Sequence, residues 1–120
     1  MAANVALIGL ARELDERHRS GRPIRIGLIG SGEMGTDIVT QVSHMRGIAV
    51  GAVAEINLPA ARRAVEIAYG DAARAREARS GSDLNAAIEA GSIALTDDAE
   101  NVISSGLIDV VIDATGVPAV

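Results

Sequence analysis

Apolar residues recur along the chain with two different periods, and the changes of period divide it into helices and strands. Within residues 3–19, the apolar positions Leu7, Leu10, Ala11 and Leu14 recur at three- and four-residue intervals, which is typical of one face of a helix. A glycine and a proline follow and end this helix. We expect the helix to cover part of a sheet or to pack on a partner.

Four short apolar runs predict strands. They occupy residues 24–29, 48–54, 93–95 and 107–113. Short runs in which Val, Ile, Leu and Ala predominate are typical of parallel strands that are covered on both faces.

Helical patterns separate these runs. We predict helices over 33–46, 57–69, 82–90 and 97–104, where turn residues and helix-capping residues flank apolar periodicity. The polar, Arg-rich segment 71–81 is predicted to be a surface excursion without a strand.

Strands that alternate with helices indicate the α/β class. Right-handed crossovers then favour a Rossmann-type, doubly wound parallel sheet with strand order 3-2-1-4. Residues 1–22 form an N-terminal helical extension in this interpretation, and residues 23–120 form the sheet domain.

The last predicted strand suggests a truncated sheet. Val110, Val111 and Ile112 are consecutive apolar residues, which suits an interior strand, yet too few residues follow for a fifth strand. We therefore expect the chain to be a fragment of a longer protein. An apolar strand at an edge invites pairing, so a homo-oligomer formed through this strand is also expected.

A glycine-rich turn joins the first strand to the next helix. Its residues are Gly30, Ser31, Gly32, Glu33, Met34 and Gly35. This G-x-G-x-x-G pattern is weak alone, but here it follows a strand, opens a helix, and precedes the acidic Glu55 by about 20 residues. Together these features predict a dinucleotide-binding site.

Each glycine of the turn has a distinct predicted task. Gly30 permits the tight turn, Gly32 lets a pyrophosphate approach the backbone, and Gly35 lets the helix pack closely on the strand. Unpaired N–H groups of the first helical turn and the helix dipole favour a phosphate. Glu33 at this helix start suits the dipole and needs no catalytic role.

Glu55 bears on the choice between NAD and NADP. A carboxylate there can accept hydrogen bonds from a ribose diol and repels a 2′-phosphate, which favours NAD. Arg62 and Arg63 on the following helix can either pair with a 2′-phosphate or form a solvated helix face. NAD is favoured on these residues, and NADP stays open.

The end of the last strand should lie beside the first, where strand order reverses and ligands bind. We therefore expect the cofactor cleft to be lined by Asp113, Ala114, Thr115 and Gly116. For Asp113 a second interpretation is that its side chain caps a local turn.

Composition narrows the remaining chemistry. Without Cys there is no disulfide, thiolate ligand or Cys nucleophile, which fits the cytoplasm; without Lys there is no Schiff base. The net charge of −5 argues against nucleic acid, and no apolar run is long enough to span a membrane. We predict no metal site, because His18 and His44 lack ligand spacing and the acids at 97, 98 and 100 suit a helix start.

Two stretches resemble a known family. Residues 24–37 and 108–116 resemble the N-terminal domain of homoserine-dehydrogenase-like oxidoreductases. Residues 1–12 look closest to the bacterial branch that resembles 1-deoxy-D-xylulose 5-phosphate reductoisomerase, whose members often carry a C-terminal SAF domain. The resemblance implies an NAD(P)-dependent oxidoreductase in which catalytic and substrate-binding residues lie beyond this domain. The branch implies NADP, whereas Glu55 favours NAD.

We therefore expect the cofactor domain of an oxidoreductase that transfers hydride to a small-molecule substrate held by another domain, and we identify no catalytic residue in this chain. An alternative is a non-catalytic nucleotide-binding or regulatory module. A third is the same fold with FAD or S-adenosylmethionine as ligand.

Overall fold

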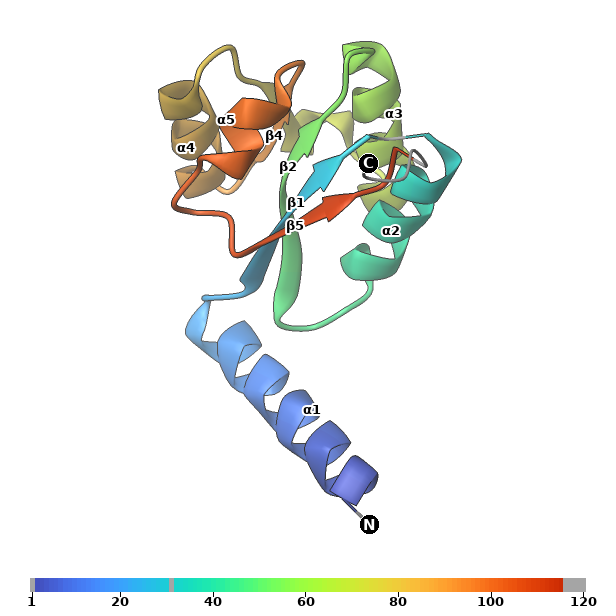
Figure 1. Ribbon diagram of the computed structural model, residues 1–120, viewed down its shortest axis with the longest axis vertical. Helices are drawn as coiled ribbons and strands as arrows, with labels where there is room; N and C mark the ends of the chain where they lie inside the picture. Colours follow the sequence, from blue (N-terminus) through green and yellow to red (C-terminus); the bar gives the residue numbers. More distant parts are fainter. Residues whose placement is uncertain (1, 31, 116–120) are drawn as a thin grey trace, which may run out of the picture.

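A parallel sheet organises the chain, for which the computed structural model describes residues 2–30 and 32–115 (Figure 1). Within these residues the sheet has five strands in the order β3-β4-β2-β1-β5. Their bounds are β1 Ile24–Ile29, β2 Ile48–Ala54, β3 Ala75–Glu77, β4 Ile93–Thr96 and β5 Val110–Asp113. The α/β class and the doubly wound parallel sheet are thus confirmed.

The four predicted strands have the predicted order, but the sheet continues past them with β3. Segment 71–81 is therefore not only a surface excursion: it contains a short 3₁₀ helix, η1 Ala72–Arg74, and then β3, which pairs with β4 from Ala75 opposite Ile93. Of the three residues in β3 only Ala75 is buried, so no apolar run marked the strand. The final strand also begins later than predicted, at Val110.

Helices cover both faces of the sheet (Figure 1). Helices α2 Glu33–Ser43 and α3 Leu58–Tyr69 lie on one face, where Val39 and Val65 pack against β1 and β2. Helices α4 Gly81–Glu89 and α5 Ala99–Ile103 lie on the other, around Leu84 and Val102. The two aliphatic cores hold the sheet between two helical layers.

Helix ends differ slightly from their predictions. Helix α2 ends at Ser43, before the predicted 46, with His44 as its C-cap. Helix α4 is capped by the Ser80 hydroxyl, which accepts the N–H of Asp83. For α5 the cap is Asp98 and not Asp97, because the Asp98 carboxylate accepts the N–H of Glu100.

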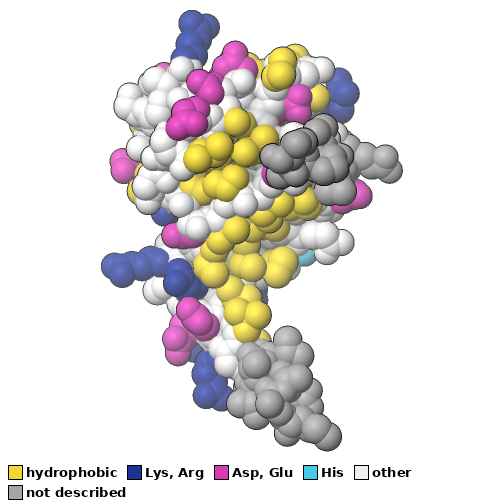
Figure 2. All heavy atoms as spheres, viewed as in Figure 1, with side chains coloured by type: hydrophobic (Ala, Val, Ile, Leu, Met, Phe, Trp, Pro, Cys, Tyr) yellow, Lys and Arg dark blue, Asp and Glu magenta, His cyan; other side chains and the backbone are white. Residues whose placement is uncertain are grey.

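Strand β5 leaves one edge of the described sheet open. Val110 and Val111 are 47% and 41% exposed, although an interior strand would bury them. Figure 2 shows hydrophobic side chains gathered on the face that contains β5 in this view. The structure thus contains an apolar strand at an edge, the arrangement that the sequence suggested.

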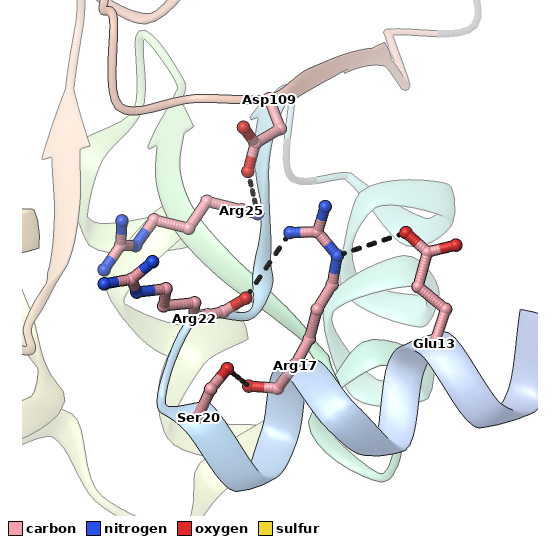
Figure 3. A network of polar contacts seen from close by, with 6 residues as sticks. All are labelled: Glu13, Arg17, Ser20, Arg22, Arg25 and Asp109. Atoms are coloured by element: carbon pink, nitrogen blue, oxygen red, sulfur yellow. Dashed lines mark hydrogen bonds and ion pairs between the residues drawn. The ribbon is translucent and has the colours of Figure 1, made fainter.

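Helix α1 Ala2–Ser20 projects away from the sheet and covers neither face (Figure 1). Its C-terminal part contacts the body: Asp15 forms an ion pair with Arg46 at 3.1 Å, and a Cβ on Gly47 would collide with the Leu14 backbone. Around the junction, Arg17 contacts Glu13 and the Arg22 carbonyl (Figure 3). The extension is therefore a protruding arm and not a cover for the sheet. Neither α1 nor any other described helix is long and apolar enough to cross a membrane.

Candidate functional site

A cleft of about 270 Å³ lies at the carboxyl ends of the strands. Loops that follow β1, β2, β4 and β5 contribute to it. Its walls are formed by Ile29, Gly30, Ala54, Glu55, Ile56, Asp97, Ala99 and Thr115. Three of the predicted site residues, Gly30, Glu55 and Thr115, thus come together from separate parts of the sequence. The cleft lies at the point where strand order reverses around β1.

Gly30 lines the cleft directly after β1 and lies close to the ends of β2 and β5. Its N–H donates to the Ala54 carbonyl at 2.7 Å, and its φ of +90° lies in the region that favours glycine. A Cβ there would approach the Thr115 Cα to 3.3 Å. The first glycine therefore serves both the turn and the close approach of the loop after β5.

Gly35 and Gly32 differ in what surrounds them. A Cβ on Gly35 would lie 2.5 Å from the Gly30 carbonyl oxygen, so this glycine allows α2 to pack on the turn. A Cβ on Gly32 would meet nothing within 4 Å, and no described side chain caps α2 at Gly32. Among the described atoms, the position of a Gly32 side chain is therefore unoccupied. Ser31 and Gly116 lie outside the described residues, as do the side chains of Glu33 and Met34.

Glu55 is half-buried directly after β2, and backbone contacts help to hold it in place. Its N–H donates to the Thr96 carbonyl at 2.8 Å, which extends the pairing of β2 with β4. Its Oε1 accepts the N–H of Asn57 at 3.1 Å. The carboxylate is therefore positioned by the backbone at the start of α3.

The loop after β5 divides its residues between the cleft and the core. Thr115 lines the cleft, whereas Ala114 is buried in the core beside α2 and α3. Asp113 Oδ1 accepts the Thr115 N–H at 3.0 Å and the Thr115 hydroxyl at 2.8 Å. These two donors, the backbone N–H first, lower the pKa of Asp113. Asp113 thus caps a local turn, the second of its two interpretations.

Part of the cleft wall was not predicted from the sequence. Ile56, Ala99 and Asp97 line the cleft, and Asp97 had been interpreted only as an acid at a helix start. A signal for Asp97 was available, because it follows β4 as Glu55 follows β2. The apolar members of the wall have no comparable signal, since isolated Ile and Ala residues occur throughout the chain.

The arginines that raised the possibility of NADP are not part of the wall. The Arg62 guanidinium contacts the Ala75 carbonyl at 3.4 Å and Glu77 at 3.8 Å, so it points toward β3. Arg63 is exposed on α3. Within the described residues, no Arg lines the cleft.

A second and larger hollow, of about 430 Å³, opens at the amino ends of the strands. It includes Arg25, Tyr69, Arg74 and Ser92, with the Arg74 guanidinium 4.8 Å from the centre of the Tyr69 ring. Burial raises the pKa of Tyr69 despite the opposing charge of Arg74. In open α/β sheets ligands bind at the carboxyl ends, so we assign the candidate site to the smaller cleft.

Metal ligation has no support among the described side chains, which contain no group of three or more His, Asp or Glu placed to hold an ion.

Models of known protein families give no match to this chain, and curated proteins give none either. The resemblance to homoserine-dehydrogenase-like oxidoreductases therefore stays a prediction from the sequence.

Proposed function

We propose that this chain is the NAD(P)-binding module of an oxidoreductase. The observation that carries the proposal is the convergence of Gly30, the first glycine of the turn, with Glu55 and Thr115 on one cleft. These residues come from three separate loops, and the cleft lies at the reversal of strand order, the usual place for a dinucleotide. If the glycine turn had only a structural role, Glu55 and Thr115 would not need to lie in the same cleft.

The cleft and the glycine turn beside it offer contacts for each part of a dinucleotide. The N–H groups of the first turn of α2 favour a pyrophosphate, and Gly32 leaves space for its approach. Glu55 would accept hydrogen bonds from a ribose diol. Apolar atoms of Ile29, Ala54 and Ile56 offer a surface for an aromatic base.

Hydride chemistry would come from the nicotinamide, while this chain binds and orients it. Among the described residues, the polar side chains that line the cleft are Glu55, Asp97 and Thr115. None of these is a His, Tyr or Lys suited to protonate a substrate carbonyl at neutral pH. We therefore propose that a small-molecule substrate is held by another domain. The same observation favours, as second candidate, a nucleotide-binding or regulatory module without catalysis.

Calorimetric titration with NAD, NADP, FAD and S-adenosylmethionine tests the proposal. We expect a nicotinamide dinucleotide to bind and the other two ligands not to bind. In a Gly32→Ala variant we expect dinucleotide affinity to fall at least about tenfold with the melting temperature unchanged, because the added methyl obstructs the phosphate and touches no described protein atom within 4 Å.

Gly81→Ala is the matched control, since a Cβ on Gly81 also meets open space but lies at the start of α4. Its affinity should equal that of the wild type. Binding of FAD or S-adenosylmethionine in preference to both dinucleotides would contradict the proposal, as would a Gly32→Ala variant that binds normally.

A further inference from the structure

Two carboxylates enter the cleft from the ends of neighbouring strands. In the pairing of β2 with β4, Ala54 lies opposite Thr96, so Glu55 and Asp97 are the next residues along each strand. The Glu55 N–H bond to the Thr96 carbonyl, 2.8 Å long, keeps these ends together. Neighbouring strands lie about 4.8 Å apart, and both residues line the same cleft.

The loop that carries Asp97 is held by its neighbours. The Thr96 hydroxyl accepts the N–H of Asp98 at 3.2 Å and an N–H of the Asn101 amide at 3.1 Å. The Asp98 carboxylate is used as the cap of α5. For Asp97 itself, which is exposed, no hydrogen-bond donor or ion-pair partner occurs among the described groups. Its carboxylate therefore adds negative charge to the cleft without a local structural task.

Two arginines, Arg62 and Arg79, lie near these carboxylates, but neither lines the cleft. Arg62 is turned toward Ala75 and Glu77. Arg79 shares an adjoining hollow with Asp97, but that hollow also contains Glu77 and lies beyond the cleft wall. Among the described residues, the wall of the cleft thus offers a phosphate two carboxylates and no guanidinium.

We infer that Asp97 is a specificity-determining residue, which acts with Glu55 to select NAD, with its free 2′-hydroxyl, against NADP. The inference rests on the proposed function and names the cofactor of that site. Two carboxylates at the ribose end repel the two negative charges of a 2′-phosphate, and this repulsion is absent for a hydroxyl. Glu55 accepts from the ribose diol, while Asp97 contributes only through its charge.

Calorimetry on the whole chain tests the inference through the ratio of the Kd for NADP to the Kd for NAD. We expect Asp97→Asn to lower this ratio about tenfold while the Kd for NAD changes little, because the variant removes charge and keeps shape. Added salt should lower the wild-type ratio and affect the variant less. Glu89→Gln is the control, since it removes the same charge from the far end of α4 and should leave the ratio unchanged.

The possible outcomes distinguish a failure of the proposed function from a failure of the inference on Asp97. If neither dinucleotide binds the wild type, the proposed function fails and this inference falls with it. If NAD binds but Asp97→Asn and Glu89→Gln give the same ratio, only the inference fails. A wild type that prefers NADP also overturns it, and loss of that preference in Arg79→Ala would assign the 2′-phosphate to Arg79.

Discussion

Gly30 and Gly35 both exclude a side chain, but for different physical reasons. Gly30 has a positive φ and touches the loop after β5, whereas Gly35 lies against the carbonyl of Gly30. The sequence predicted both tasks from spacing alone, since a helix that starts directly after a turn must pass close to it. Neither residue needs a ligand to explain it, so their effects on stability are separable from binding.

At Gly35, substitution by Ala is expected to lower the free energy of unfolding by about 1 to 3 kcal/mol, because the new Cβ would lie 2.5 Å from the Gly30 carbonyl oxygen. Urea unfolding followed by circular dichroism measures the change. Gly81→Ala is the control and should lose no stability, since its Cβ meets open space. Equal stability of the two variants would show that α2 does not pack on the turn in this way.

Asp113 is the residue for which the sequence left two interpretations open, and its hydrogen bonds to Thr115 decide for the turn. In Thr115→Val we expect the pKa of Asp113 to rise but to stay below its ordinary value of 3.8, because the hydroxyl donor is lost and the stronger backbone N–H donor remains. Carboxyl carbon shifts in an NMR pH titration measure this pKa. An unchanged value would contradict the hydroxyl contact.

The sign of the pH dependence follows from the same shift. The folded-state pKa of Asp113 lies below the unfolded value, so the group adds stability at pH values above its unfolded pKa. That contribution is lost as the pH falls through the folded pKa. Thr115→Val should reduce the pH dependence below about pH 4, where this carboxyl titrates.

Among site residues, position along a strand was the most informative signal. Glu55 could be predicted because it ends β2 at the spacing that the glycine turn requires. Asp97 was missed because two adjacent acids before a helix suggest a cap, and only the contacts show that Asp98 alone performs it. The wall residues Ile56 and Ala99 could not be predicted, since their place depends on how loops pack.

Among elements, the longer ones could be predicted and the short edge strand could not. Strand β2 is a continuous apolar run and β1 is apolar except for Arg25, because helices cover both faces of these strands. Strand β3 has one buried residue and two exposed charged ones, and its pairing with β4 is a tertiary event. Helix α1 was predicted from its periodicity, but its protrusion depends on contacts near Asp15 and Gly47 that periodicity does not encode.

The exposed strand β5 predicts that the chain self-associates. We expect the chain to self-associate through this exposed edge. Val111→Lys should reduce the association, because a charged Lys on an edge strand opposes pairing with another chain. Sedimentation velocity over a range of concentrations measures it. Ile67→Lys, an equally drastic change at an exposed position on α3, is the control. A monomeric wild type, or the same effect from both variants, would count against pairing through β5.

Two of the hollows among the described residues lie at opposite ends of the sheet. The carboxyl-end cleft is lined by Gly30 of the glycine turn and by two carboxylates, whereas the amino-end hollow is larger and is lined by Arg25 and Arg74. The chain as a whole is acidic, so an anionic ligand attracted by charge alone would bind at the amino-end hollow, where the arginines lie. A dinucleotide recognised through backbone N–H groups and a ribose diol would favour the glycine turn.

Amide chemical shifts recorded during titration with NAD distinguish these two ends most directly. We predict that the largest changes fall on Gly30, Glu55 and Thr115, which line the cleft, and on Gly32 and Gly35 of the adjoining glycine turn. Amides around the amino-end hollow, at residues 25, 69 and 92, should stay unchanged. Changes centred on the amino-end hollow, or no changes at saturating NAD, would contradict the assignment of this chain as a dinucleotide-binding module.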